Sequence, residues 1–63
     1  MASYRMFFIE DGRIRSADAF EAPHDDAAKL YLEGLRRGRI AELWSRERLV
    51  SRYERDRPAP DHR

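Results

Sequence analysis

Three consecutive residues, His24, Asp25 and Asp26, form the group in the sequence best suited to hold a metal ion. Imidazole nitrogen and carboxylate oxygen are common metal ligands, but neighbouring residues at a helix start point in different directions, and no second group of ligands accompanies them. Aspartate at such a position also caps free backbone N–H groups and suits the positive end of the helix dipole. We therefore interpret Asp25 and Asp26 as helix-capping residues and expect no metal site.

Groups suited to catalysis are also scarce. Glu10 and Asp11 form a carboxylate pair, but the Asp11-Gly12 dipeptide is explained by turn chemistry. None of the four serines has a base in a sensible relation to it, and there is no glycine-rich phosphate loop. A chain of 63 residues has little room for a pocket of about 300 Å³ or more that excludes water. We expect no enzyme activity and no cofactor.

Arginine is the most abundant residue that could bind a ligand. Twelve arginines and one lysine oppose twelve acidic residues, and this near balance argues against a dedicated polyanion binder. The best nucleic-acid candidates are Arg36, Arg37, Arg39 and Arg48, with aromatic residues nearby for base stacking. Glutamates interspersed among them favour a solvated, salt-bridged surface instead. A small accessory nucleic-acid-binding protein is therefore the alternative function.

The elements that position these side chains begin with a hairpin. Residues 4–9 are aromatic and apolar, which is typical of a strand, and Asp11-Gly12 predicts a two-residue turn into a second strand over 13–20. The predicted cross-strand pairs are Ile9 with Ile14, Phe7 with Ser16 and Arg5 with Asp18.

A helix is predicted over residues 25–37. Its apolar stripe consists of Ala28, Tyr31, Leu32 and Leu35. Gly38 is a natural left-handed stop. Gly34 costs about 1 kcal/mol against alanine inside the helix, and we interpret it as a position that permits close packing.

A second hairpin is predicted from residues 40–44 and 48–53, around a turn without glycine at Ser45-Arg46-Glu47. Its predicted pairs are Trp44 with Leu49 and Leu43 with Val50. Residues 55–63 carry two prolines and no large apolar side chain, and we expect them to form a disordered tail.

The predicted fold is therefore α+β: residues 1–54 form a single ββαββ domain, an antiparallel sheet of two hairpins with one helix packed on one face. Strand order, and the face that the helix covers, stay open at this point. The start of the chain lacks the features of a signal peptide, and Met6 to Ile9, its longest apolar run, is far too short to span a bilayer. We expect a cytoplasmic protein without membrane contact.

Several motifs together suggest a kinship. They are Tyr4-Arg5 with Phe8, Asp11-Gly12-Arg13-Ile14, Phe20-Glu21-Ala22, Asp26 with Ala28, and Glu42-Leu43-Trp44 with Arg48-Leu49-Val50. This pattern resembles a large group of short alphaproteobacterial proteins to which no function is assigned, and the match covers nearly all of residues 4–53. The resemblance implies a bacterial protein, but no activity, cofactor or ligand.

The most informative feature is that large apolar residues occupy both faces of the predicted sheet. One short helix covers one face, and an uncovered apolar face in a soluble protein usually marks a contact with another protein. We therefore expect a non-catalytic interaction module that self-associates, as a homodimer, or docks on a larger protein through the helix-free face. We expect that face to contact its partner through Trp44, Tyr53, Phe7, Ile9, Ile40 and Leu49. No small-molecule substrate is expected.

Overall fold

Two antiparallel hairpins and one helix make up residues 1–55, the part of the chain described in this computed structural model. In chain order the elements are β1 (Ala2–Glu10), β2 (Arg13–Ala22), α1 (Asp25–Arg36), β3 (Ile40–Ser45) and β4 (Arg48–Tyr53). The predicted ββαββ α+β domain is thus confirmed. The predicted disordered tail lies, from residue 56 onward, outside the described residues.

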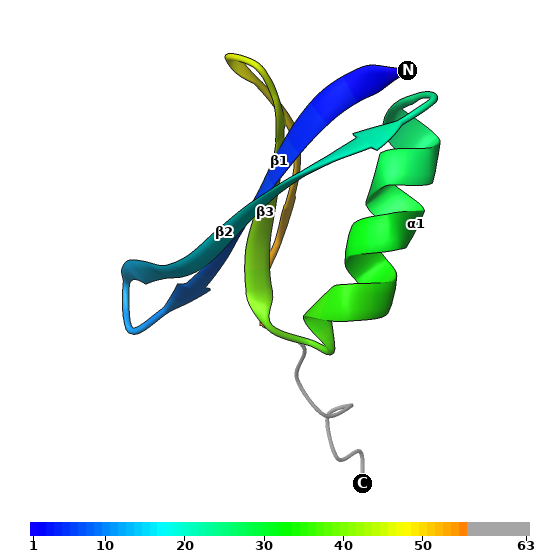
Figure 1. Cartoon of the computed structure of the whole chain (residues 1–63). Helices are drawn as coiled ribbons and strands as arrows, with labels where there is room; N and C mark the ends of the chain where they lie inside the picture. The colour runs from blue at the N-terminus through cyan, green and yellow to red at the C-terminus, as the bar shows by residue number, and fades with distance from the viewer. Residues whose placement is uncertain (56–63) are drawn as a thin grey trace, which may run out of the picture.

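The four strands form one sheet in the order β2-β1-β3-β4, which the sequence left open. Strands β1 and β3 therefore lie in the centre, and the two hairpins join there through the antiparallel pairing of β1 with β3. Figure 1 shows α1 on one face of the sheet, with the β1–β2 turn projecting away from it. The other face carries no element of the described chain.

The core lies between α1 and the central strands. Alternate residues of β1 point toward the helix, and β3 and α1 complete the layer. The buried apolar residues of this core are Tyr4, Met6, Phe8, Ala22, Ala28, Leu32, Ala41 and Leu43. Leu32 and Leu43 are the largest side chains in it that are fully enclosed. The helix thus covers the face formed by Tyr4, Met6 and Phe8.

The first hairpin has the predicted turn but a different register. Asp11 and Gly12 both have positive φ, as a tight two-residue turn requires, and Ile9 pairs with Ile14 as predicted. Beyond that pair a β-bulge inserts Arg15 into β2. The predicted partners of the next residues are therefore wrong by one position: Phe7 pairs with Ala17 and Arg5 with Ala19.

The second hairpin contains a bulge at the equivalent place. Trp44 pairs with Leu49 as predicted, but Leu43 pairs with Ser51, because Val50 is the extra residue. The bulge reverses the face of the residues that follow it. Tyr53 consequently pairs with the buried Ala41 and packs against the core, so its predicted place on the helix-free face is wrong.

The helix begins at Asp25, as predicted, but a different residue caps it. The N-cap is His24, whose Nδ1 accepts a hydrogen bond from the Ala27 N–H at 3.2 Å. The prediction that Asp25 or Asp26 caps the helix is therefore wrong. The prediction that both carboxylates lie in the first turn, where the helix dipole stabilises negative charge, is confirmed.

The helix ends at Arg36, one residue before its predicted end. Gly38 has a φ of 77°, in agreement with the predicted left-handed stop, and Arg37 at the C-cap is also left-handed. The apolar stripe differs from its prediction, because Tyr31 and Leu35 are 50% and 39% exposed. Only Ala28, Leu32 and the buried Arg36 face the sheet fully, so α1 has a narrow apolar contact with it.

Gly34 has no packing role, contrary to its predicted one, since a Cβ built there meets nothing within 4 Å. We expect Gly34→Ala to raise the free energy of unfolding by about 1 kcal/mol, because alanine removes the entropic penalty of glycine in a helix. Urea unfolding measures the change. Gly12→Ala is the control: it also has open space, but its φ of +75° makes alanine strained, so stability should fall. A loss of stability in Gly34→Ala would contradict the free space at this position.

Candidate functional site

The helix-free face of the sheet carries several large apolar side chains, with two charged residues among them: Glu42 lies opposite Phe7 and Arg5 lies opposite Trp44. Phe7 and Ile9 alternate with the buried residues of β1, and β3 and β4 extend the set across the sheet. Its members are Phe7, Ile9, Ile14, Ile40, Trp44 and Leu49, which we call the outer apolar face. Four of them are half-buried, whereas Leu49 is 45% and Ile14 62% exposed.

A polar contact fixes the orientation of the largest of these side chains. The Trp44 indole Nε1–H donates a hydrogen bond of 3.0 Å to Glu42 Oε1. The other carboxylate oxygen of Glu42 lies 3.8 Å from Arg52 Nε. A shallow hollow of about 280 Å³ adjoins the indole and is lined in part by Phe7 and Arg5. The indole is thus held in place while part of it stays accessible to a partner.

Five of the six predicted interface residues lie together on this face: Phe7, Ile9, Ile40, Trp44 and Leu49. Tyr53 is separated from them, because it lies on the helix side with the Arg36 guanidinium 4.7 Å from its ring centroid. Ile14 is a member that the sequence reasoning left out. Its pairing with Ile9 was predicted, and that pairing alone places Ile14 on the same face.

The four arginines of the nucleic-acid alternative are not equivalent. Arg36 is buried: its NH1 donates to the backbone oxygens of Arg39 and Glu54 at 2.6 and 3.1 Å, and its Nε lies 3.3 Å from Glu33. These contacts join the end of the helix to the start of β3 and the end of β4. Arg36 is thus a structural residue.

Arg39 and Arg48 are also engaged within the molecule. Arg39 donates from Nε to the Arg36 oxygen and from NH2 to the Leu35 oxygen, both at 2.8 Å, so it covers free carbonyls at the helix C-terminus. Arg48 makes a two-point contact with the Asp25 carboxylate, at 3.1 and 3.2 Å. Arg37 is exposed, and its side chain takes part in no hydrogen bond or ion pair among the described residues.

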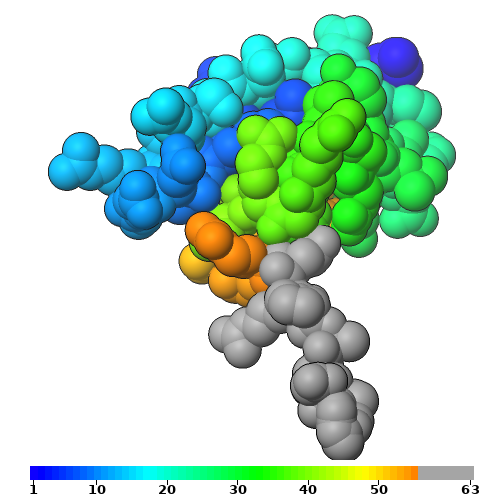
Figure 2. Space-filling view, turned by 90° about the horizontal axis from the view of Figure 1, so that it is seen from below, coloured from blue at the N-terminus to red at the C-terminus, as the bar shows by residue number. Residues whose placement is uncertain are grey.

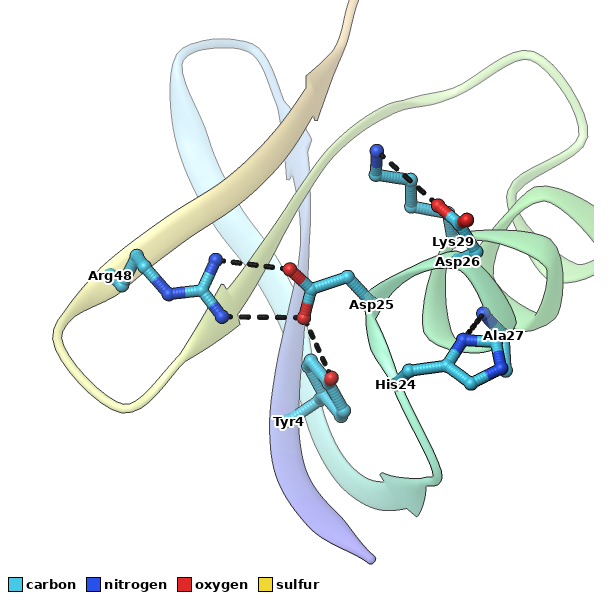
Figure 3. Close-up of polar contacts among 7 residues, drawn as sticks. All are labelled: Tyr4, His24, Asp25, Asp26, Ala27, Lys29 and Arg48. Carbon is cyan, nitrogen blue, oxygen red and sulfur yellow. Dashed lines mark hydrogen bonds and ion pairs between the residues drawn. The ribbon is translucent and has the colours of Figure 1, made fainter.

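At the helix N-terminus, Asp25 is the centre of a polar cluster, shown in Figure 3. It accepts the two bonds from Arg48 and a third, of 2.7 Å, from the Tyr4 hydroxyl. The hydrogen bonds from Arg48 and then from Tyr4 hold the pKa of Asp25 below its ordinary value. The same bond to Asp25, together with burial, raises the pKa of Tyr4. This cluster attaches the first turn of α1 to β1 and β4.

Two features of the described residues concern metal binding and membranes: the grouping of possible metal ligands, and the length and polarity of the helix. Among residues 1–55, no group of three or more histidine, cysteine or acidic side chains is arranged to hold a metal ion. The helix in that range is too short and too polar to cross a membrane.

Comparison with known proteins yields no relative: no family model matches the chain, and no curated protein or solved structure matches it. The kinship with the alphaproteobacterial group therefore stays a prediction, and functional inference has to be based on the molecule's own surfaces.

We expect Arg36→Ala to lower the free energy of unfolding by about 2–3 kcal/mol, because it leaves two backbone oxygens without their charged donor. The neighbouring Arg37→Ala, at an exposed position, should change stability by less than about 0.5 kcal/mol. Urea unfolding of both variants measures the difference. Equal effects in the two variants would contradict the structural role of Arg36.

The polar cluster predicts a dependence of stability on pH. The pKa of Asp25 is lowered in the folded state, so its contribution is present above the ordinary value of 3.8 and is lost as pH falls further. The pKa of Tyr4 is raised, so its contribution is present below the ordinary value of 10.0 and is lost as pH rises through the folded value. Thermal unfolding across the pH range should therefore show losses at both ends. Asp25→Asn should reduce the acid loss, and an unchanged acid profile in that variant would refute the assignment.

Proposed function

We propose that this protein is a non-catalytic interaction module that self-associates through the outer apolar face. The observation that supports this most directly is that Phe7, Ile9, Ile40 and Trp44 all lie on the two central strands, on the face that α1 does not cover. Apolar side chains gathered in this way on a small protein are typical of an interface with another protein. Trp44 is the expected centre of the contact, since tryptophan is strongly enriched among the residues that dominate binding energy.

The small core favours association as well. Its two large fully enclosed side chains are Leu32 and Leu43, and the helix contributes little apolar area beyond Ala28 and Leu32. A domain of this size generally needs reinforcement, and the sequence contains no cysteine for disulfides. Burial of the outer apolar face against a partner would add apolar area on the opposite side of the same sheet.

The charges on this face are compatible with a second copy of the chain as the partner. Arg5 and Arg52 are balanced in part by Glu42 and Glu21, so the face carries both signs and can oppose an identical face in a two-fold arrangement. The two central strands pair over five residues, so four strands about 4.8 Å apart give a shared face of roughly 19 by 17 Å. A face of about 320 Å² is well below the roughly 800 Å² that each partner buries in a standard interface, so we expect a weak dimer with a micromolar or weaker dissociation constant.

Docking on a larger protein through the same residues is the other form of this proposal, and the test separates the two. The nucleic-acid alternative has less support, because Arg36 is buried and donates to backbone oxygens, and Arg48 is paired with Asp25. We place the module in the bacterial cytoplasm as part of the proposal, on the grounds of the sequence pattern given above.

The test is the solution mass by light scattering from about 1 µM to about 1 mM, on the wild type and on Trp44→Ala. The wild type should shift from monomer to dimer in this range. Trp44→Ala should weaken the dimer about thirtyfold, the equivalent of about 2 kcal/mol, while its unfolding transition stays cooperative.

Two matched variants control for unrelated effects. Leu30→Ala removes an apolar side chain that is 74% exposed on the helix, and it should leave the dimer unchanged. Tyr53→Ala should lower stability, because Tyr53 packs against the core, without the selective effect on association. A strict monomer over the whole range would rule out self-association and leave docking on a larger protein. Loss of folding in Trp44→Ala would place Trp44 in the core and refute the site itself.

A further inference from the structure

A second feature, distinct from the outer apolar face, is a hollow of about 460 Å³ at the C-terminal end of α1. Figure 2 shows this end of the molecule, where the connection from α1 to β3, in yellow-green, lies beside the blue β1–β2 hairpin and the orange end of β4. The charged residues that line the hollow are Arg15, Arg37, Arg39, Arg55 and Glu10. We call it the arginine hollow.

The arginines of the hollow keep much of their capacity to donate hydrogen bonds. Arg39 is held in place by its two bonds to helix carbonyls, with its guanidinium 4.2 Å from the Phe8 ring centroid. Those two bonds use two of its five donors. Arg37 and Arg55 are exposed, and their side chains make no hydrogen bond or ion pair within residues 1–55. Arg15 lies 3.4 Å from Glu10, and both side chains are well exposed.

The charge of this hollow contrasts with that of the molecule. Four arginines and one glutamate leave an excess of three positive charges among the residues that line the hollow, whereas the whole chain has a net charge of +1. The rest of the protein is therefore net negative. A concentration of guanidinium groups at one end of a nearly neutral protein attracts anions to that end.

Apolar residues also line the hollow. They are Phe8, whose ring is covered by the Arg39 guanidinium, and the half-buried Ile9 and Ile40, which offer contact area for an apolar group beside the charges. Arginine recognises phosphate through paired N–H donors, and its plane also stacks on flat rings. A phosphate ester carries close to two negative charges at neutral pH, which matches the local excess better than a single carboxylate does.

We propose that the arginine hollow binds a phosphate monoester of about nucleotide size, with the phosphate held by Arg37, Arg39 and Arg55 and the organic part against Ile9 and Ile40. The volume of the hollow is within the range of small-molecule sites, about 300–1,000 Å³. The arginines proposed to hold the phosphate do not belong to the outer apolar face, so variants of them test this site separately from self-association.

The test uses the full-length protein and NMR amide shifts, with adenosine monophosphate as the probe and adenosine and inorganic phosphate as comparisons. Adenosine monophosphate should give saturable shifts near residues 8–10, 15 and 37–40, with an affinity about tenfold higher than that of inorganic phosphate. Adenosine should give none. Higher salt should weaken the binding, because the attraction is between exposed charges.

Charge-reversal variants test the assignment to this site. Arg37→Glu should weaken binding of adenosine monophosphate at least about tenfold. Arg46→Glu makes the same change of net charge in the other hairpin and should leave the affinity within about twofold. Equal losses in the two variants, or no saturable shift with up to about 10 mM adenosine monophosphate, would overturn the proposal. Binding of a 5′-phosphorylated oligonucleotide about tenfold more tightly than the mononucleotide would overturn the small-molecule assignment in favour of a nucleic acid.

Discussion

The organisation of this molecule depends on one constraint: a single short helix covers one face of a sheet that is apolar on both. At about 1.5 Å per residue, the twelve residues of α1 extend about 18 Å, and they lie over β1, β3 and one end of β2. Successive residues of a strand point to opposite faces, so the run Met6 to Ile9 supplies both the core and the surface behind it. One apolar segment thus generates an inner set of side chains that folds the domain and an outer set that has no partner within the described chain.

The narrow contact of the helix explains why so many charged side chains are engaged inside the molecule. Ala28 and Leu32 bury little area, and polar contacts at both ends of α1 supplement them. At the N-terminus, Asp25 receives three hydrogen bonds, from Arg48 and Tyr4. At the C-terminus, the guanidinium of Arg36 reaches backbone oxygens next to β3 and β4. Several of the arginines therefore stabilise the packing of this small helix on its sheet.

Much of this fold could be predicted from the sequence, because short stretches of neighbouring residues determine its turns and the ends of its helix. The Asp11-Gly12 turn, the change from alternating to helical spacing, and the stop at Gly38 each depend on a few neighbouring residues. Strand order was not predictable in this way. The pairing of β1 with β3 depends on how the two hairpins meet in space, and neither hairpin contains a signal for it.

The errors in the predicted site have the same origin. Both hairpins contain a bulge, at Arg15 and at Val50. Neither arginine nor valine is a residue type that predicts a bulge. An extra residue reverses the alternation, and this is why Tyr53 lies in the core layer although simple counting places it beside Trp44. The structural roles of Arg36 and Arg39 were also hidden, since they depend on carbonyl groups that become free only where the helix ends.

The two proposed surfaces meet at one pair of residues. Ile9 and Ile40 are cross-strand partners at the edge of the outer apolar face, and the same two side chains line part of the arginine hollow. A ligand in the arginine hollow therefore changes the apolar area that the outer apolar face can bury in a dimer, and a dimer partner likewise changes the area available in the hollow. Two ligands that share contact residues are coupled in their binding free energies, and the coupling is equal in both directions. Anion binding and self-association in this protein are thus expected to influence one another through these two isoleucines, even though different residues direct each of them.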